Sequence, residues 1–294
     1  MRRKRVAITG TTGRVGAALA GKLADHHDVI PLPRTALDLA DDVSLRTALD
    51  GLDCDVFLNP AALTSLEACE DDPKLAMRVN SAAPGKIAEW AAANGVRMIH
   101  FSTDYVFAGD TMVKPDEAAE AKPLSAYGRS KLAGERAVLH HPGHLVLRVS
   151  WVFGPEKPSF IDQVFKTALA GGKLSAVSDK TSLPTYTVDL CDWIEDLLHT
   201  PVGGILHACN PGAPVSWHGL AVRVVREMQQ AGLLDHAPEV EPLVLSEMKS
   251  FRAARPRFTA MDCTRLASIV SSPPRPWEAA VREYVKSLCN GPPA

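Results

Sequence analysis

The chain lacks a strong excess of charge of either sign. Its 32 Lys and Arg residues nearly balance its 34 Asp and Glu residues, which leaves a formal net charge of -2 over 294 residues. Proteins that bind nucleic acid or an acidic membrane through their overall field carry a larger positive charge. We therefore expect neither partner, and we interpret the basic cluster Arg2–Arg5 as the solvated start of a first strand.

Long apolar runs are also missing. No segment approaches the roughly 18 apolar residues of a membrane span. The first apolar stretch, Val6–Gly10, is too short for the apolar part of a signal peptide. The expected location is the cytoplasm.

Closely spaced cysteines are absent as well. No two cysteines have the separation of a zinc or redox motif, so we expect reduced thiols that fill the core. The six positions are Cys54, Cys69, Cys191, Cys209, Cys263 and Cys289.

What the chain does contain is 46% hydrophobic residues, enough for a full core. In its first half, short apolar runs alternate with segments of helical periodicity, a pattern typical of a parallel sheet covered by helices on both faces. The expected strands are residues 6–9, 29–32, 55–58, 97–101 and 145–149, and the expected helices follow residue 14, begin near Pro84 and contain Tyr127–Val138. The predicted fold is an α/β, Rossmann-type doubly wound sheet.

The second half has more turn signals, which favours a smaller, interleaved substrate domain. We predict a cofactor-binding domain over residues 1–150, with returning segments around 174–196, and a substrate domain over 151–173 and 197–290. Asp189 and Ser216 are candidate helix N-caps, and the Gly-Pro-Pro-Ala tail is expected to be disordered.

A glycine-rich loop follows the first expected strand and opens the first expected helix. Gly10 permits a tight turn, Gly13 allows the backbone to approach a pyrophosphate, and Gly16 allows close helix packing. The helix N-terminus adds free N–H groups and a positive dipole. This context predicts dinucleotide binding by Gly10, Thr12, Gly13, Arg14, Val15 and Gly16.

The end of the second expected strand bears on cofactor choice. An acidic residue there would bind the ribose 2'-hydroxyl of NAD(H), whereas a basic residue would accept the 2'-phosphate of NADP(H). The segment carries Arg34 and no carboxylate at that point. The sequence therefore favours NADP(H), with NAD(H) as the alternative.

Tyr127 and Lys131 are four residues apart in a helix-favouring stretch, so both project from one helical face. A tyrosine is a weak acid, and an adjacent ammonium would bring its pKa closer to neutral. We expect the pair to transfer a proton and to contact the cofactor, with Lys131 holding the nicotinamide ribose. Thr103, at the end of a buried strand, is the candidate hydrogen-bond donor to a substrate carbonyl. Asn80 is a further candidate for the cofactor site, where it would anchor the backbone or a water chain near Lys131; the alternative is a structural amide.

With these motifs assembled, the chain resembles the dTDP-4-dehydrorhamnose reductase family, an extended branch of the short-chain dehydrogenases/reductases. The resemblance covers nearly the whole chain. It rests on residues 9–16, 38–39, 59–62, 66–70, 102–107, 123–135 and 148–154, and on the late segments 255–257 and 262–266.

The resemblance implies NADPH-dependent reduction of the C4 keto group of a nucleotide-linked 4-keto-6-deoxyhexose, in dTDP-rhamnose biosynthesis. A homodimer is among the assemblies to expect. The resemblance also implies that Asp38 and Leu39 flank the adenine and that Asp104, Tyr105 and Trp151 face the sugar. The residues that would line the cofactor are Ala61, Ala62 and Thr64.

The chain departs from the family at Pro60 and Leu63, which leaves the substrate open. Ala17 and Ala18 stand where some members carry a metal-binding glutamate, so no metal site is expected. Two other functions stay open. One is a non-catalytic regulator that resembles the methionine adenosyltransferase beta subunit, and the other is a nucleotide-sugar epimerase.

Overall fold

The computed structural model describes residues 2–289. The C-terminal tail, for which disorder is expected, lies outside the described residues. Among residues 2–289, none of the helices has both the length and the apolar character needed to cross a membrane.

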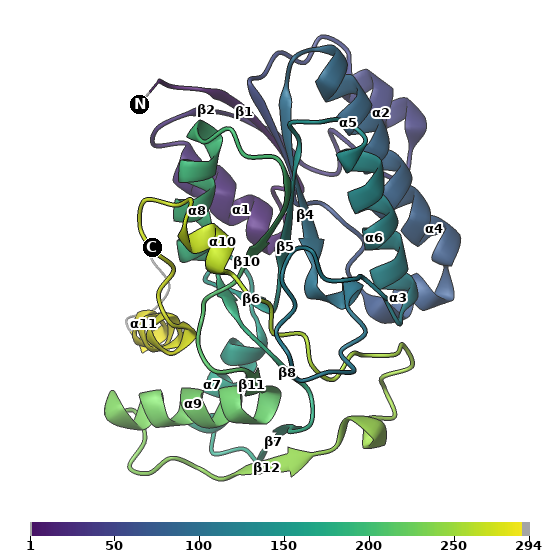
Figure 1. Ribbon diagram of the computed structural model, residues 1–294. Helices are drawn as coiled ribbons and strands as arrows, with labels where there is room; N and C mark the ends of the chain where they lie inside the picture. The colour runs from purple at the N-terminus through teal and green to yellow at the C-terminus, as the bar shows by residue number, and fades with distance from the viewer. Residues whose placement is uncertain (1, 290–294) are drawn as a thin grey trace.

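A six-stranded parallel sheet forms the upper part of the molecule (Figure 1), in the order β10-β5-β4-β3-β1-β2. Its strands are β1 (Arg5–Thr9), β2 (Asp28–Leu32), β3 (Val56–Asn59), β4 (Arg97–Thr103), β5 (Leu145–Val149) and β10 (Gly204–Ala208). The five strands expected from the sequence are confirmed. The sixth, β10, was not predicted, because Gly203-Gly204 reads as a turn and the strand that follows is short.

Helices cover both faces of this sheet, as Figure 1 shows. Val6 and Ile8 of β1 pack toward one face, and Ala7 packs toward the other. This two-sided burial explains why the strands are continuous apolar runs. One face is covered by α1 (Arg14–Leu23), α8 (Thr187–His199) and α10 (Thr264–Ala267), and the other by α2 (Asp42–Leu49), α5 (Ala83–Ala93) and α6 (Ala126–Leu139).

Short helices connect the sheet strands near their carboxyl ends. After β3 the chain passes through α3 (Leu66–Asp71), α4 (Pro73–Met77) and the π-helical turn η1 (Arg78–Ala82), and after β4 through the 3-10 turn η2 (Asp104–Val106).

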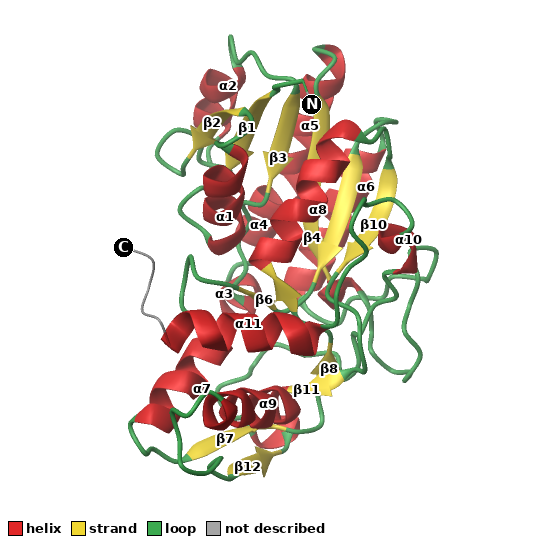
Figure 2. Cartoon of the chain, turned by 90° about the vertical axis from the view of Figure 1, so that its left-hand side faces the viewer, coloured by secondary structure: helices red, strands yellow, loops and turns green. Residues whose placement is uncertain are grey.

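A second core lies below the carboxyl ends of the sheet strands (Figure 2). Its helices are α7 (Phe160–Leu169), α9 (Trp217–Gln230) and α11 (Trp277–Cys289), with the 3-10 turn η3 (Leu245–Glu247). Its strand pairs are β7 (Leu174–Val177) with β12 (Val240–Leu243), β8 (Thr181–Ser182) with β11 (Val215–Ser216), and β6 (Val152–Phe153) with β9 (Thr185–Tyr186).

Strand pairing differs from the expected division at two places. β7 pairs with β12 in the lower part, although residues 174–196 were expected to return to the upper domain. β10 pairs with β5 in the central sheet, although residues 197–290 were expected below. The division into a cofactor-binding and a substrate domain remains a proposal, with these two strands exchanged.

One of the two expected helix caps is wrong. Ser216 caps α9 by accepting a hydrogen bond from the Gly219 N–H, as predicted. Asp189 lies inside the first turn of α8, which begins two residues earlier. Its carboxylate instead accepts hydrogen bonds from Asn210 and Arg275, and so links α8 to distant segments.

Candidate active site

A cavity of about 780 Å³ opens at the carboxyl ends of the sheet strands, where ligands bind in doubly wound folds. Nearly all of the candidate site residues line it. They are Gly10, Thr12, Gly13, Arg14, Val15, Gly16, Arg34, Asp38, Leu39, Ala61, Ala62, Thr64, Thr103, Asp104, Tyr105, Tyr127, Lys131 and Trp151.

The glycine loop has the shape that a dinucleotide requires. Gly10 has a φ of 58°, in the left-handed region that favours glycine. A Cβ on Gly16 would meet the backbone of Gly10 and lie 2.9 Å from the carbonyl oxygen of Thr9. Gly13 is the N-cap of α1 and offers no side chain to the first-turn N–H groups. These donors therefore stay available for an anion such as a pyrophosphate.

Arg34 and Asp38 form an ion pair on the cavity wall, at the residues expected to lie near the adenine. The Arg34 Nε donates to Asp38 Oδ2 at 3.2 Å, and 81% of the Arg34 side chain is exposed. The Ala40 N–H and the guanidinium hold the pKa of the Asp38 carboxyl below its usual value. Arg34 is thus a solvent-exposed cation at the end of the second sheet strand, where the sequence analysis expects the ribose.

Arg14 serves mainly to connect two parts of the chain. Its guanidinium donates to the carbonyl oxygens of Val152 at 2.9 Å and of Pro158 at 2.7 Å. These bonds fasten the start of α1 to the segment that follows β5, and they place the arginine on the wall of the cavity.

Thr103 and Asp104 end β4 within a buried hydroxyl network. Thr103 Oγ1 donates to Asp104 Oδ1 at 3.1 Å, and Ser150 and Ser182 donate to Oδ2 of the same carboxylate. Asp104 is only 2% exposed. Its carboxylate is held by three hydroxyl groups, which fixes the Thr103 hydroxyl at the cavity wall.

Tyr127 and Lys131 line the cavity from the first turns of α6. The prediction that Lys131 lowers the pKa of Tyr127 is wrong for the ligand-free protein. Burial raises the pKa of Tyr127, a hydrogen bond with Thr103 opposes this rise, and Lys131 is not among the groups that shift it. The Lys131 amine contacts the Phe101 carbonyl oxygen at 2.6 Å and His100 Nε2 at 3.2 Å instead.

Asn80 is not on the cavity wall. It is fully buried, accepts the Leu63 N–H at 2.8 Å, and donates to the Leu63 carbonyl and to Ser130. The amide therefore anchors the backbone behind the wall, and the structure gives it no direct path to a cofactor.

Trp151 is the strained residue of the site. Its φ of 41° is the one left-handed value of a non-glycine residue in the described chain. Its indole Nε1 is buried and has no hydrogen-bond partner among the described residues. A strained backbone and an orphaned donor beside a cavity favour a ligand that supplies an acceptor oxygen.

A second cavity of about 600 Å³ adjoins the first and shares Arg14, Trp151 and Val152 with it. The sequence analysis missed its walls, because they come from α7 and α9, far along the chain. They include Phe160, Lys166 and Trp217. The Trp217 ring lies 5.8 Å from that of Trp151 and 6.1 Å from that of Phe160.

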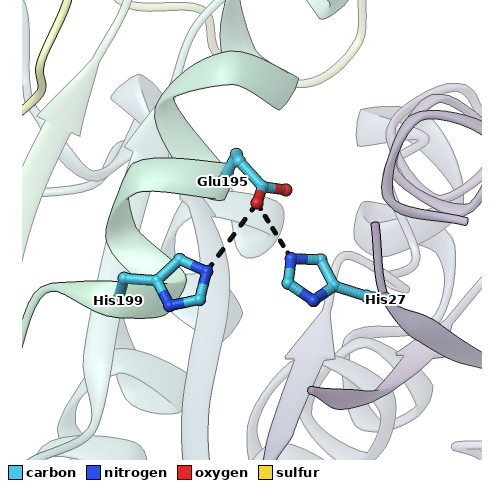
Figure 3. A group of neighbouring side chains, drawn as sticks. All are labelled: His27, Glu195 and His199. Carbon is cyan, nitrogen blue, oxygen red and sulfur yellow. Dashed lines mark hydrogen bonds and ion pairs between the residues drawn. The ribbon is translucent and has the colours of Figure 1, made fainter. Parts of the chain in front are cut away.

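His27, just before β2, lies beside Glu195 and His199 of α8 (Figure 3), and none of the three lines either cavity. His27 Nε2 lies 2.9 Å from Glu195 Oε1, and its Nδ1 accepts the Lys4 N–H at 3.1 Å. A neutral imidazole that accepts at Nδ1 carries its proton on Nε2. That nitrogen therefore donates to Glu195 and has no lone pair for a metal ion.

Comparison with known proteins shows that the chain is similar to sugar-nucleotide reductases. Residues 4–290 match the family described as RmlD substrate binding domain. A dTDP-4-dehydrorhamnose reductase of Mycolicibacterium smegmatis is 34% identical over 97% of this chain and 86% of its own. A probable dTDP-4,6-dihydroxy-2-methyloxan-3-one 4-ketoreductase of Streptomyces antibioticus is 35% identical over 94% of this chain and 92% of its own.

A solved structure shows the same similarity. The crystal structure of dTDP-4-dehydrorhamnose reductase from Bacillus anthracis, in complex with NADP, superposes with a TM-score of 0.89 and 27% identity. The match covers 97% of this chain and all of the other.

Proposed function

The chain belongs to the RmlD substrate binding domain family, and on that premise we propose that it is an NADPH-dependent oxidoreductase. Its reaction is the reduction of the C4 keto group of a nucleotide-linked 4-keto-6-deoxyhexose, as in dTDP-rhamnose biosynthesis. One observation carries the proposal. Thr103, Tyr127 and Lys131 line the same cavity as the glycine loop, so a substrate carbonyl and a dinucleotide can meet there.

The cofactor fits the residues present. The uncapped N–H groups at the start of α1 suit the pyrophosphate, and Arg34 suits a 2'-phosphate. NADPH, when bound, supplies the hydride. Asp38 could instead receive a 2'-hydroxyl, so NAD(H) remains the alternative cofactor.

The chain's own residues supply the proton and the positioning. Tyr127 gives its hydroxyl proton to the C4 oxygen as that oxygen becomes an alcohol. Thr103 Oγ1 carries one hydrogen, which points at Asp104 Oδ1 in the structure; when the substrate binds, the hydroxyl turns this hydrogen to the C4 oxygen and polarises the carbonyl. Burial of Tyr127 raises its pKa and keeps it protonated, as a proton donor must be.

The second cavity suits the nucleotide of the substrate. Three aromatic rings, those of Trp151, Phe160 and Trp217, offer stacking surface for a base. Lys166 offers a cation for a diphosphate. The orphaned indole N–H of Trp151, at the junction of the two cavities, would donate to an oxygen of the sugar or phosphate.

The decisive experiment follows NADPH oxidation with dTDP-4-dehydrorhamnose and with other nucleotide 4-keto sugars. We expect turnover with at least one of them and its loss, by about two orders of magnitude or more, in Tyr127→Phe. Tyr186→Phe is the matched control, since Tyr186 is also buried but lies outside the cavity. Wild-type turnover in Tyr127→Phe would overturn the mechanism.

The two other functions give different results in the same preparation. A regulatory subunit would leave NADPH unoxidised and co-purify with a synthetase. An epimerase would retain NAD after purification and consume no added NADPH. Homodimer formation, tested by light scattering, is part of the proposal, as are the cytoplasmic location and the absence of a nucleic-acid partner.

A further inference from the structure

The amine of Lys131 is enclosed between α6 and β4. It is 1% exposed, and its two polar contacts are the Phe101 carbonyl oxygen and the ring of His100, which is fully buried. A charged lysine can only donate hydrogen bonds, a neutral one can also accept one, and a histidine nitrogen donates or accepts according to its tautomer. The tautomer of His100 therefore decides which form of Lys131 the site suits.

Behind His100 runs a buried chain of hydrogen bonds. Thr9 Oγ1 accepts a hydrogen bond from the Ala61 N–H at 3.2 Å. The hydroxyl hydrogen of Thr9 still needs an acceptor of its own. That acceptor is Asn59 Oδ1 at 2.7 Å. With its oxygen engaged, Asn59 turns its amide nitrogen toward His100 Nδ1 at 3.0 Å. Because buried polar groups need partners, this orientation of the amide is the one that satisfies the whole chain.

This chain sets the tautomer of His100. Since Nδ1 accepts the Asn59 N–H, a neutral imidazole carries its proton on Nε2 and points it at Lys131. An ammonium has no lone pair to accept that proton. A neutral amine accepts it and still donates to the Phe101 carbonyl. The surroundings are thus complementary to the uncharged form of Lys131.

We propose that His100 is a positioning residue for this site: its Nε2–H holds the amine of Lys131, and Thr9 and Asn59 keep the imidazole in the tautomer that can do so. The catalytic consequence rests on the proposed function. Once Tyr127 has given its proton to the sugar oxygen, it must regain one. The Lys131 ammonium gives one proton to the Tyr127 phenolate and becomes the amine, which His100 Nε2–H stabilises; the amine then takes a proton back from solvent.

The charges around Lys131 agree with this assignment. Burial lowers the pKa of Lys131 to about 8, and Glu135, one helical turn further along α6, opposes that shift. The Glu135 carboxylate is already paired with Arg148 of β5 at 2.6 Å. Burial holds the pKa of His100 well below its usual value, so the imidazole stays neutral; Lys131, when it is charged, lowers this pKa further, and the Asn59 backbone opposes the shift.

The test measures the pKa of Lys131 directly in the full-length, ligand-free protein, by NMR of lysine labelled with ¹³C at Cε. Lys131→Met identifies the signal. In His100→Phe the pKa should rise by about one unit, the equivalent of one lost buried hydrogen bond. His100→Gln, whose amide N–H can replace Nε2–H, should stay close to the wild type. His144→Phe, which replaces another buried histidine, is the control.

Two results would overturn the proposal. A fall in the pKa in His100→Phe would mean that His100 accepts from the ammonium, and an unchanged pKa would mean that it only fills space. The ¹⁵N shifts of His100 in the wild-type protein test the tautomer without any variant, and a proton on Nδ1 also contradicts it. None of these measurements needs a substrate, so they decide the proposal even if the reductase activity proves wrong. In an active enzyme, the basic limb of the pH profile of kcat/KM should shift to higher pH in His100→Phe.

Discussion

Glu135 of α6 and Arg148 of β5 form a buried bidentate ion pair. Arg148 Nε donates to Glu135 Oε1 at 2.9 Å and Nη2 donates to Oε2 at 2.6 Å, and both side chains are 2% exposed. Ser102 Oγ donates to the same carboxylate. The pair joins α6 to β5, and it therefore helps to position Lys131, which lies one helical turn before Glu135.

Arg148→Met should cost about 3–5 kcal/mol of unfolding free energy, because it leaves the Glu135 carboxylate buried without its partner charge. Urea unfolding followed by circular dichroism measures this loss. The double variant with Glu135→Leu should recover much of it, since no buried charge remains. A loss below about 1 kcal/mol in the single variant would show that water reaches the carboxylate.

Gly16→Ala should weaken NADPH binding at least about tenfold. The new Cβ would lie 2.7 Å from the carbonyl carbon of Gly10, so the loop must open. Gly21→Ala is the matched control on the same helix, where a Cβ meets nothing within 4 Å. That variant should keep NADPH binding and gain about 0.5–1 kcal/mol of stability. Fluorescence titration with NADPH compares the two, and equal affinities would contradict the loop assignment.

Arg34→Ala should weaken NADPH binding about tenfold and leave NADH binding nearly unchanged, because only NADPH carries the 2'-phosphate. The effect should shrink at high salt, since the guanidinium is exposed. Arg46→Ala, an exposed arginine of α2, controls for general charge. If NADPH and NADH bind the wild-type protein equally well, Arg34 does not select the cofactor.

Trp217→Ala should raise the KM for the nucleotide sugar about tenfold and change kcat little, because the ring lines the second cavity and not the reacting centre. Base stacking on an aromatic side chain is worth about 1–3 kcal/mol. Trp217→Phe should restore most of the affinity. A fall in kcat at unchanged KM would place the nucleotide elsewhere.

The protein should lose stability as the pH falls below about 6.5. Burial lowers the pKa of His207 from 6.5 to about 4, so the folded state resists protonation that the unfolded chain accepts. Stability is intact above 6.5 and is lost as the pH approaches 4. Between pH 7.5 and pH 5 the loss from this residue is about 2 kcal/mol.

Urea unfolding at the two pH values tests this expectation. His207→Gln should remove part of the slope, and the control His236→Gln, at an exposed position, should keep it. His100 and His144, whose pKa values are also lowered, add to the loss in the same direction. Constant stability from pH 7.5 to pH 5 would contradict the burial of these side chains.

Much of the upper fold could be predicted because the signals are local. A strand buried on both faces is an apolar run, as at Val6–Thr9, and a helix that ends at Asn94-Gly95 carries its own stop signal. The short strand β10 was missed because Gly204, at φ 85°, begins it and reads as a turn. Its partner β5 lies more than 50 residues earlier in the chain.

The sequence by itself determined which chemistry the chain carries. Gly10, Gly13, Tyr127 and Lys131 are recognisable from local spacing, because turn geometry and one helical face depend on near neighbours.

Tertiary structure alone decided how those groups are used. It turned Lys131 toward His100, moved Asn80 behind the cavity wall, and strained Trp151 beside a second cavity. It also brought the thiols of Cys209 and Cys263 to 2.9 Å across 54 residues. Such contacts depend on the register and packing of elements far apart in the chain, which no local pattern encodes.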